Sequence, residues 1–139
     1  MSSVYQSSYR KQQVEGATPL GLVLLTYEAL IQSLAKTREA IESNDFETRF
    51  EQSTRAMRAL LELISTLDHD EGGEIANNLT SMYTYMYGRL MEEQAGDLKG
   101  AVEEVLELAQ TLRDGWMELG QKLEHEEKRG DAHSQAAVA

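Results

Sequence analysis

Hydrophobic residues recur every three or four positions along most of the chain, which is the period of a helix that buries one face. The first such stretch begins at Thr18-Pro19, because threonine caps a helix and proline is tolerated at its first position. It ends before the polar run Ser43-Asn44-Asp45. The predicted core stripe of this helix is Leu20, Leu24, Tyr27, Ile31, Leu34 and Ile41.

The same pattern predicts two further helices. Asp45 can cap the second helix, and the pattern stops between Asp68 and Gly73, where paired glycines favour a turn. The third helix is predicted from about Glu74 to Ala95-Gly96. The predicted core residues are Phe46, Phe50, Met57, Leu60, Ile64 and Leu67 in the second helix and Ile75, Leu79, Met82, Met86 and Leu90 in the third.

The last predicted helix has the most regular pattern and follows a capping residue, Asp97. Its apolar residues alternate four and three apart: Leu98, Val102, Val105, Ala109, Leu112, Trp116, Leu119 and Leu123. Four amphipathic helices with short links predict an all-α fold, an antiparallel four-helix bundle over residues 16–125. Residues 1–15 are expected to form a short helical cap segment on this bundle, and residues 126–139, which have no stripe, a disordered tail.

The length and net charge of the chain exclude some classes of function. A chain of 139 residues suits one domain, and 24 acidic against 13 basic residues give a net charge of -11. This charge repels nucleic acid and anionic lipid headgroups, so we expect neither as a partner. No apolar stretch approaches the roughly 18 residues of a membrane span, and no secretory signal is seen, so we expect a cytoplasmic protein without membrane insertion.

Catalytic and metal-binding motifs are not found in the sequence. Cysteine is absent, which excludes disulfides and thiolate ligands. None of His69, His125 and His133 has a glutamate three residues before it, as the di-iron bundle motif requires. The acidic run at Asp68 lacks the glutamate that a calcium loop needs at its twelfth position, because that position is Leu79. The sequence therefore predicts no metal, no cofactor and no enzyme.

Apolar residues outside the core stripes indicate a surface that binds a partner. In a helical projection Leu22, Leu25 and Ala29 point away from the core of the first long helix, and Tyr85 and Tyr87 lie off the core arc of the third. An amphipathic tyrosine ring suits a surface that is covered for part of the time. All six tyrosines lie in the N-terminal segment or in these two helices: Tyr5, Tyr9, Tyr27, Tyr83, Tyr85 and Tyr87.

Three occupants fit such a surface. The N-terminal segment of the same chain can cover it, acting as a lid that a partner displaces. A second copy of the chain can bury it in a homodimer contact. An amphipathic helix of a partner can bind there in a groove. The pattern of residues leaves these alternatives open.

Several runs of residues resemble a known protein family over about residues 4–123. They include the run Glu71-Gly72-Gly73-Glu74-Ile75-Ala76 with Leu67-Asp68 before it and Asn78-Leu79, Met82-Tyr83, Tyr85-Met86 and Arg89-Leu90 after it. Nearer the N-terminus the matching residues are Tyr9, Val14, Thr18-Pro19 and Leu22-Val23-Leu24, and in the last helix Val105, Leu112-Arg113 and Trp116. Together these residues resemble the FliS family of flagellar export chaperones.

The resemblance implies a cytosolic bacterial chaperone with a helical bundle and no cofactor. Such a chaperone binds the disordered C-terminal segment of flagellin, prevents its premature polymerisation, and contacts the membrane export gate when loaded. A monomer or weak homodimer is expected. The alternative is a structural helical-bundle homo-oligomer, or an adaptor, with no secretion role. The candidate partner-binding residues are Tyr5, Tyr9, Val14, Leu22, Leu25, Ala29, Ile75, Asn78, Tyr83, Tyr85 and Tyr87.

Overall fold

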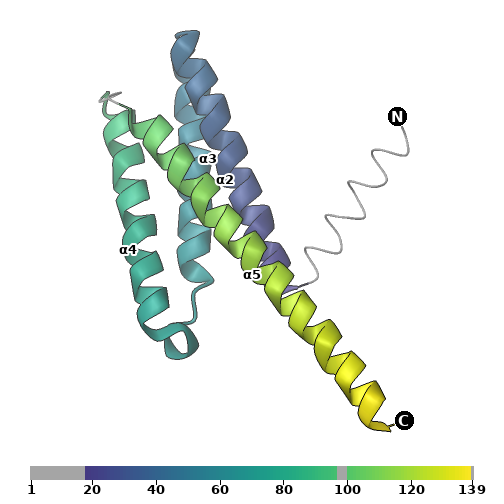
Figure 1. Cartoon of the computed structure of the whole chain (residues 1–139). Helices are drawn as coiled ribbons and strands as arrows, with labels where there is room; N and C mark the ends of the chain where they lie inside the picture. The colour runs from purple at the N-terminus through teal and green to yellow at the C-terminus, as the bar shows by residue number, and fades with distance from the viewer. Residues whose placement is uncertain (1–17, 97–99, 139) are drawn as a thin grey trace, which may run out of the picture.

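The computed structural model describes residues 18–96 and 100–138, with side chains placed up to residue 130. All regular secondary structure in this part of the chain is helical (Figure 1). The predicted all-α fold is confirmed. The helices are α2 (Pro19–Glu42), α3 (Phe46–Ser65), α4 (His69–Gln94) and α5 (Ala101–Val138).

The four helices form an antiparallel bundle in which each helix packs against two others. α2 packs against α3 and α5, and α4 packs against the same two helices from the other side. α2 and α4 therefore lie diagonally across the bundle, and Figure 1 shows consecutive helices running in opposite directions. The predicted bundle follows from the short connections, because a short turn places consecutive helices side by side.

Capping side chains fix where α2 and α3 begin. The Thr18 hydroxyl accepts a hydrogen bond from the Gly21 amide at 2.9 Å, and Pro19 occupies the first position of α2. The Asp45 carboxylate accepts one from the Thr48 amide at 3.1 Å at the start of α3. Both predicted helix starts are confirmed.

Small side chains are buried on α2 and α3 beside the large ones. They are Ser33, Thr37 and Ala40 on α2 and Ser53, Ala56 and Ala59 on α3. On α3 the buried face also carries Met57, Leu60 and Leu63, of which Met57 and Leu60 were predicted. The predicted core positions Phe46 and Phe50 were wrong, because their side chains are 68% and 58% exposed. The guanidinium of Arg49 lies 5.5 Å from the centroid of the Phe46 ring.

The start of α4 differs from the prediction of a helix from about Glu74. Asp68 caps a first turn that begins at His69, and the helical conformation is interrupted at Gly73, with φ 50° and ψ -121°. Glycine tolerates this conformation because it has no Cβ. We call residues 68–73 the α4 elbow. Because the elbow redirects the chain, Ile75, predicted in the core stripe, is 71% exposed.

α5 continues past the rest of the bundle (Figure 1). The predicted disordered tail from residue 126 was wrong, since the helix extends through Val138. Residues 121–130 are exposed, so good helix formers and local pairs such as Glu124 with Lys128, at 3.8 Å, support this part rather than packing. Leu119 and Leu123, predicted in the packed stripe, are exposed for the same reason. The predicted cap segment, Asp97 and Leu98 lie outside the described residues.

Candidate partner-binding pocket

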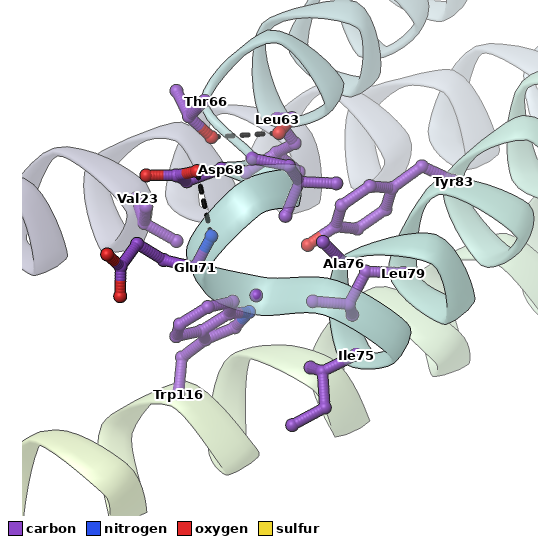
Figure 2. Close-up of a pocket in the computed structure, with 12 residues that line it drawn as sticks. Val23, Leu63, Thr66, Asp68, Glu71, Ile75, Ala76, Leu79, Tyr83 and Trp116 are labelled. Atoms are coloured by element: carbon purple, nitrogen blue, oxygen red, sulfur yellow. Dashed lines mark hydrogen bonds between the residues drawn. The ribbon is translucent and has the colours of Figure 1, made fainter.

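An open apolar pocket of about 270 Å³ lies at the end of the bundle where α2 and α4 begin and α3 ends (Figure 2). Side chains from all four helices line it, so the pocket exists only when the bundle is assembled. The lining residues are Val23 from α2, Leu63, Thr66 and Leu67 from the end of α3, Asp68, Glu71, Gly72, Ile75, Ala76, Leu79 and Tyr83 from the elbow and α4, and Trp116 from α5.

The α4 elbow forms one wall of this pocket. One Asp68 carboxylate oxygen accepts hydrogen bonds from the amides of Asp70 and Glu71, at 3.0 and 3.1 Å. A Cβ on Gly72 would lie 2.9 Å from the Cβ of Ala76, so glycine is what lets the first turn fold back onto the main helix. His69 and Asn77 add a hydrogen bond of 3.1 Å between their side chains. Interactions between residues that are close in sequence therefore shape this wall of the pocket.

Tyr83 in the floor of the pocket makes a buried polar contact with a residue of the diagonal helix beneath it. The hydroxyls of Tyr27 and Tyr83 lie 2.5 Å apart, with their ring centroids at 6.4 Å. Trp116 Nε1 donates a hydrogen bond to the Tyr27 hydroxyl at 3.2 Å. Burial raises the pKa of both tyrosine hydroxyls above the ordinary value of 10.0. Both side chains therefore keep their hydroxyl hydrogens at neutral pH.

The mouth of the pocket combines exposed apolar surface with negative charge. Ile75 stands at the rim, and Asp68 and Glu71 contribute carboxylates beside it. The Thr66 hydroxyl already donates to the Leu63 carbonyl at 2.8 Å. The pocket can therefore receive apolar groups, while its rim disfavours anions.

The structure brings two of the predicted partner-binding residues together in this pocket, Ile75 at the rim and Tyr83 at the floor. Tyr83 is 1% exposed, so a partner would reach it only through the pocket. It points inward because the α4 face that meets Tyr27 is the core face. Asn78 on the same helix is exposed and does not line the pocket.

The other predicted residues lie on different surfaces. On the outer face of α2, Leu22 and Ala29 are exposed and Leu25 is half-buried. Ala29 lines a shallow polar groove between α2 and α3. Tyr85 is exposed and donates a hydrogen bond to Glu104 at 2.6 Å, whereas Tyr87 is half-buried against the core. Tyr5, Tyr9 and Val14 lie outside the described residues.

Sequence reasoning missed several residues of the pocket because it assigned them to the core. Leu67, Leu79 and Trp116 were predicted as core residues, yet each is half-buried and lines the pocket. The feature of the sequence that could have indicated the pocket is the Gly72-Gly73 pair close after the capping residue Asp68. Paired glycines interrupt a helix.

Two further properties concern the part of the chain that the structure describes. It contains no group of three or more His, Cys, Asp or Glu side chains placed to hold a metal ion. None of its helices is both long enough and apolar enough to cross a membrane.

The run Glu71-Gly72-Gly73-Glu74-Ile75-Ala76 supplies four of the twelve lining residues, and a family model that contains this region matches the chain. The model, described as flagellar protein FliS, matches residues 1–123. The chain belongs to the FliS family. All lining residues of the pocket fall within the matched part.

Curated FliS proteins are similar to nearly the whole chain. A protein of Bacillus subtilis named flagellar secretion chaperone FliS is 29% identical over 133 residues, which cover 96% of this chain and 95% of that protein. The Campylobacter jejuni protein of the same name is 28% identical, covering 81% and 88%. Flagellar secretion chaperone FliSB of Pseudomonas aeruginosa is 30% identical, covering 81% and 89%. Membership of this family supports a chaperone role in flagellar secretion, as the sequence predicted.

Proposed function

We propose that this chain is a cytoplasmic export chaperone that binds the C-terminal segment of flagellin and keeps it from polymerising before export. The observation that supports this most directly is the open apolar pocket in the FliS signature region, with Ile75 71% exposed at its rim. A large exposed apolar side chain beside an apolar hollow is a surface that binding would remove from water.

The size of the pocket suits an amphipathic helix. A cavity of about 150 Å³ lined by apolar side chains binds benzene. A pocket of about 270 Å³ therefore has room for two apolar side chains one helical turn apart. Flagellin's terminal segment would present such pairs when it folds on the chaperone, in the helix-in-groove mode.

The remaining predicted residues are proposed as contacts outside the pocket. These are Leu22, Leu25 and Ala29 on α2, Asn78, Tyr85 and Tyr87 on α4, and Tyr5, Tyr9 and Val14 in the N-terminal segment. A cargo that folds on binding can wrap such separated surfaces. The loaded complex would then contact the membrane export gate.

The single tryptophan of the chain provides a direct test, because Trp116 lines the pocket. Titration with a purified flagellin C-terminal peptide is expected to shift the Trp116 emission and to give a stoichiometric complex. Calorimetry is expected to show a negative heat-capacity change, since apolar surface is buried. No binding at micromolar concentration contradicts the proposal.

Two matched variants test whether flagellin binds at this pocket. Ile75→Asp introduces a charge at the pocket rim, and binding is expected to weaken at least about tenfold because the carboxylate must be desolvated. Leu61→Asp is the control, since Leu61 is 51% exposed on α3 and does not line the pocket. Equal loss of binding in both variants would place the cargo elsewhere.

One observation favours a second candidate, the structural homo-oligomer. Three large apolar side chains of α5 are exposed: Met117, Leu119 and Leu123. A self-contact would bury them without any flagellin. Analytical ultracentrifugation separates the two, because the oligomer predicts a concentration-independent dimer without cargo, whereas the chaperone is expected to be a monomer or weak homodimer.

A further inference from the structure

Three hydrogen-bonded side chains beneath the pocket have more donor hydrogens than the hydrogen bonds that they make with one another. Trp116 Nε1, the Tyr27 hydroxyl and the Tyr83 hydroxyl supply three donor hydrogens. Trp116 donates to the Tyr27 oxygen, and one tyrosine donates to the other. The third hydrogen has no acceptor among the described residues. The raised pKa values of both tyrosines mean that this hydrogen is not lost as a proton.

The position of the two hydroxyls decides which tyrosine carries the unused hydrogen. Tyr27 is completely buried and does not line the pocket, so an unused hydrogen there would be a buried unsatisfied donor. Tyr83 lines the pocket, and Figure 2 shows its hydroxyl directed toward the centre of the lining residues. The favoured arrangement is therefore Trp116 to Tyr27, Tyr27 to Tyr83, and Tyr83 into the pocket.

Among the described residues, the Tyr83 hydroxyl makes no hydrogen bond other than the one with Tyr27. Most side chains of the lining are apolar, and the carboxylates of Asp68 and Glu71 stand at the mouth of the pocket, where Asp68 accepts from the amides of the elbow. The Thr66 hydroxyl donates to the Leu63 carbonyl and is not bonded to Tyr83. An entering group that brings an acceptor oxygen satisfies Tyr83, whereas a purely apolar group would leave its hydrogen unpaired.

We propose that Tyr83 is a specificity-determining residue that donates a hydrogen bond to an uncharged acceptor oxygen on the cargo. The acceptor would be the side chain of a Gln, Asn, Ser or Thr that lies on the apolar face of the bound helix. A carboxylate acceptor is disfavoured because Asp68 and Glu71 stand at the mouth and the net charge is -11. This inference rests on the proposed function, since it assigns a chemical preference to the same pocket.

The test is a coupled scan of chaperone and cargo. In a flagellin C-terminal peptide each Gln, Asn, Ser and Thr is replaced singly by an apolar residue of similar shape, such as Thr→Val or Gln→Met. Each peptide is titrated against the unaltered chaperone and against Tyr83→Phe. One replacement is expected to weaken binding about tenfold for the unaltered chaperone and by less than about twofold for Tyr83→Phe.

Two variants serve as matched controls. Tyr27→Phe breaks the same buried chain and costs similar stability, but it leaves the Tyr83 hydroxyl in place. Thr80→Val removes a hydroxyl on the same helix that is bonded to the Ala76 carbonyl and does not line the pocket. Both are expected to keep the full tenfold discrimination. A scan in which no replacement depends on Tyr83, or in which Thr80→Val behaves like Tyr83→Phe, overturns the inference.

A measurement on the unaltered protein covers the case in which Tyr83→Phe does not fold. The Tyr83 hydroxyl proton is expected to become protected from exchange, and visible by NMR, when the peptide binds. The identified replacement should abolish this protection, and protection that persists with every peptide overturns the inference. If the peptide binds and shifts Trp116 emission without such selectivity, the proposed function stands and the inference fails. If no peptide binds, both fail.

Discussion

The carboxylate of Glu93 on α4 lies 3.1 Å from Nε of Arg49 on α3, and the Glu93 side chain is completely buried. Arg49 also covers the Phe46 ring, so this arginine links the beginning of α3 to the end of α4. Burial raises the pKa of Glu93 above 4.5, and the charge of Arg49 and the Ser53 hydroxyl oppose this rise. The burial effect is the larger one. The protonated form is therefore favoured more in the folded chain than in the unfolded chain.

We expect Glu93→Gln to change how stability depends on pH. A carboxyl whose pKa is higher in the folded state contributes stability below its ordinary pKa and loses it as the pH rises through the folded value. The glutamine variant does not titrate there. Its free energy of unfolding, relative to the unaltered protein, should therefore rise with pH above 4.5, by at most about 1.4 kcal/mol per pH unit.

Urea unfolding at a series of pH values measures this difference. Glu107→Gln is the control, because Glu107 is exposed and its surroundings change little on unfolding. A difference for Glu93→Gln that is flat or that falls with pH would contradict the assignment of burial as the dominant effect.

Much of the fold could be predicted because local chemistry determines where the helices begin. Thr18, Pro19 and Asp45 act through their own side chains on the next turn, so they can be recognised without tertiary information. The buried face of α3 was only partly predictable. Met57 and Leu60 were predicted and are buried, whereas Phe46 and Phe50 are exposed. A search for large apolar side chains passes over the buried Ala56 and Ala59.

The pocket was only partly predictable, because an opening depends on which neighbouring element is absent. Periodicity places Ile75 and Trp116 on apolar stripes whether or not another helix covers them. The elbow at Gly73 turns Ile75 out, and that requires a backbone conformation that no stripe reveals. Tyr83 was predicted as a partner residue for its chemistry, whereas its burial against Tyr27 follows from the diagonal contact of α2 and α4.

The conformation of Gly73 predicts a large effect of adding one methyl group. At φ 50° and ψ -121° an alanine side chain is strained, so Gly73→Ala is expected to lose about 1–3 kcal/mol of stability. Relief of that strain would displace the elbow and weaken flagellin binding. Urea unfolding and Trp116 titration measure the two effects.

Gly88→Ala is the matched comparison in the same helix. Gly88 is helical, and no atom lies within 4 Å of the position of its added Cβ. This variant should gain about 0.5–1 kcal/mol, because alanine loses less backbone entropy than glycine in a helix. If both substitutions shift stability in the same direction, the described interruption of α4 is wrong.

Two leucines on α2 should respond in opposite ways to the same substitution. Leu30 is completely buried, so Leu30→Asp is expected to unfold the bundle by burying a charge without a partner. Leu22 is 55% exposed, and Leu22→Asp should change the free energy of unfolding by no more than about 0.5 kcal/mol. Circular dichroism and urea unfolding make the comparison. Weaker flagellin binding by the folded Leu22→Asp variant would support the α2 face as a second contact.

Removal of residues 126–139 tests the helical extension of α5. Residues 121–130 are exposed, so the shortened chain should keep its free energy of unfolding within about 0.5 kcal/mol. Its far-UV circular dichroism per molecule should nevertheless decrease, because residues 126–138 continue a helix already held by the bundle and need no new nucleus. An unchanged signal per molecule would mean that these residues are not helical in solution. Flagellin binding should persist, since Trp116 and the rest of the pocket lie before the truncation.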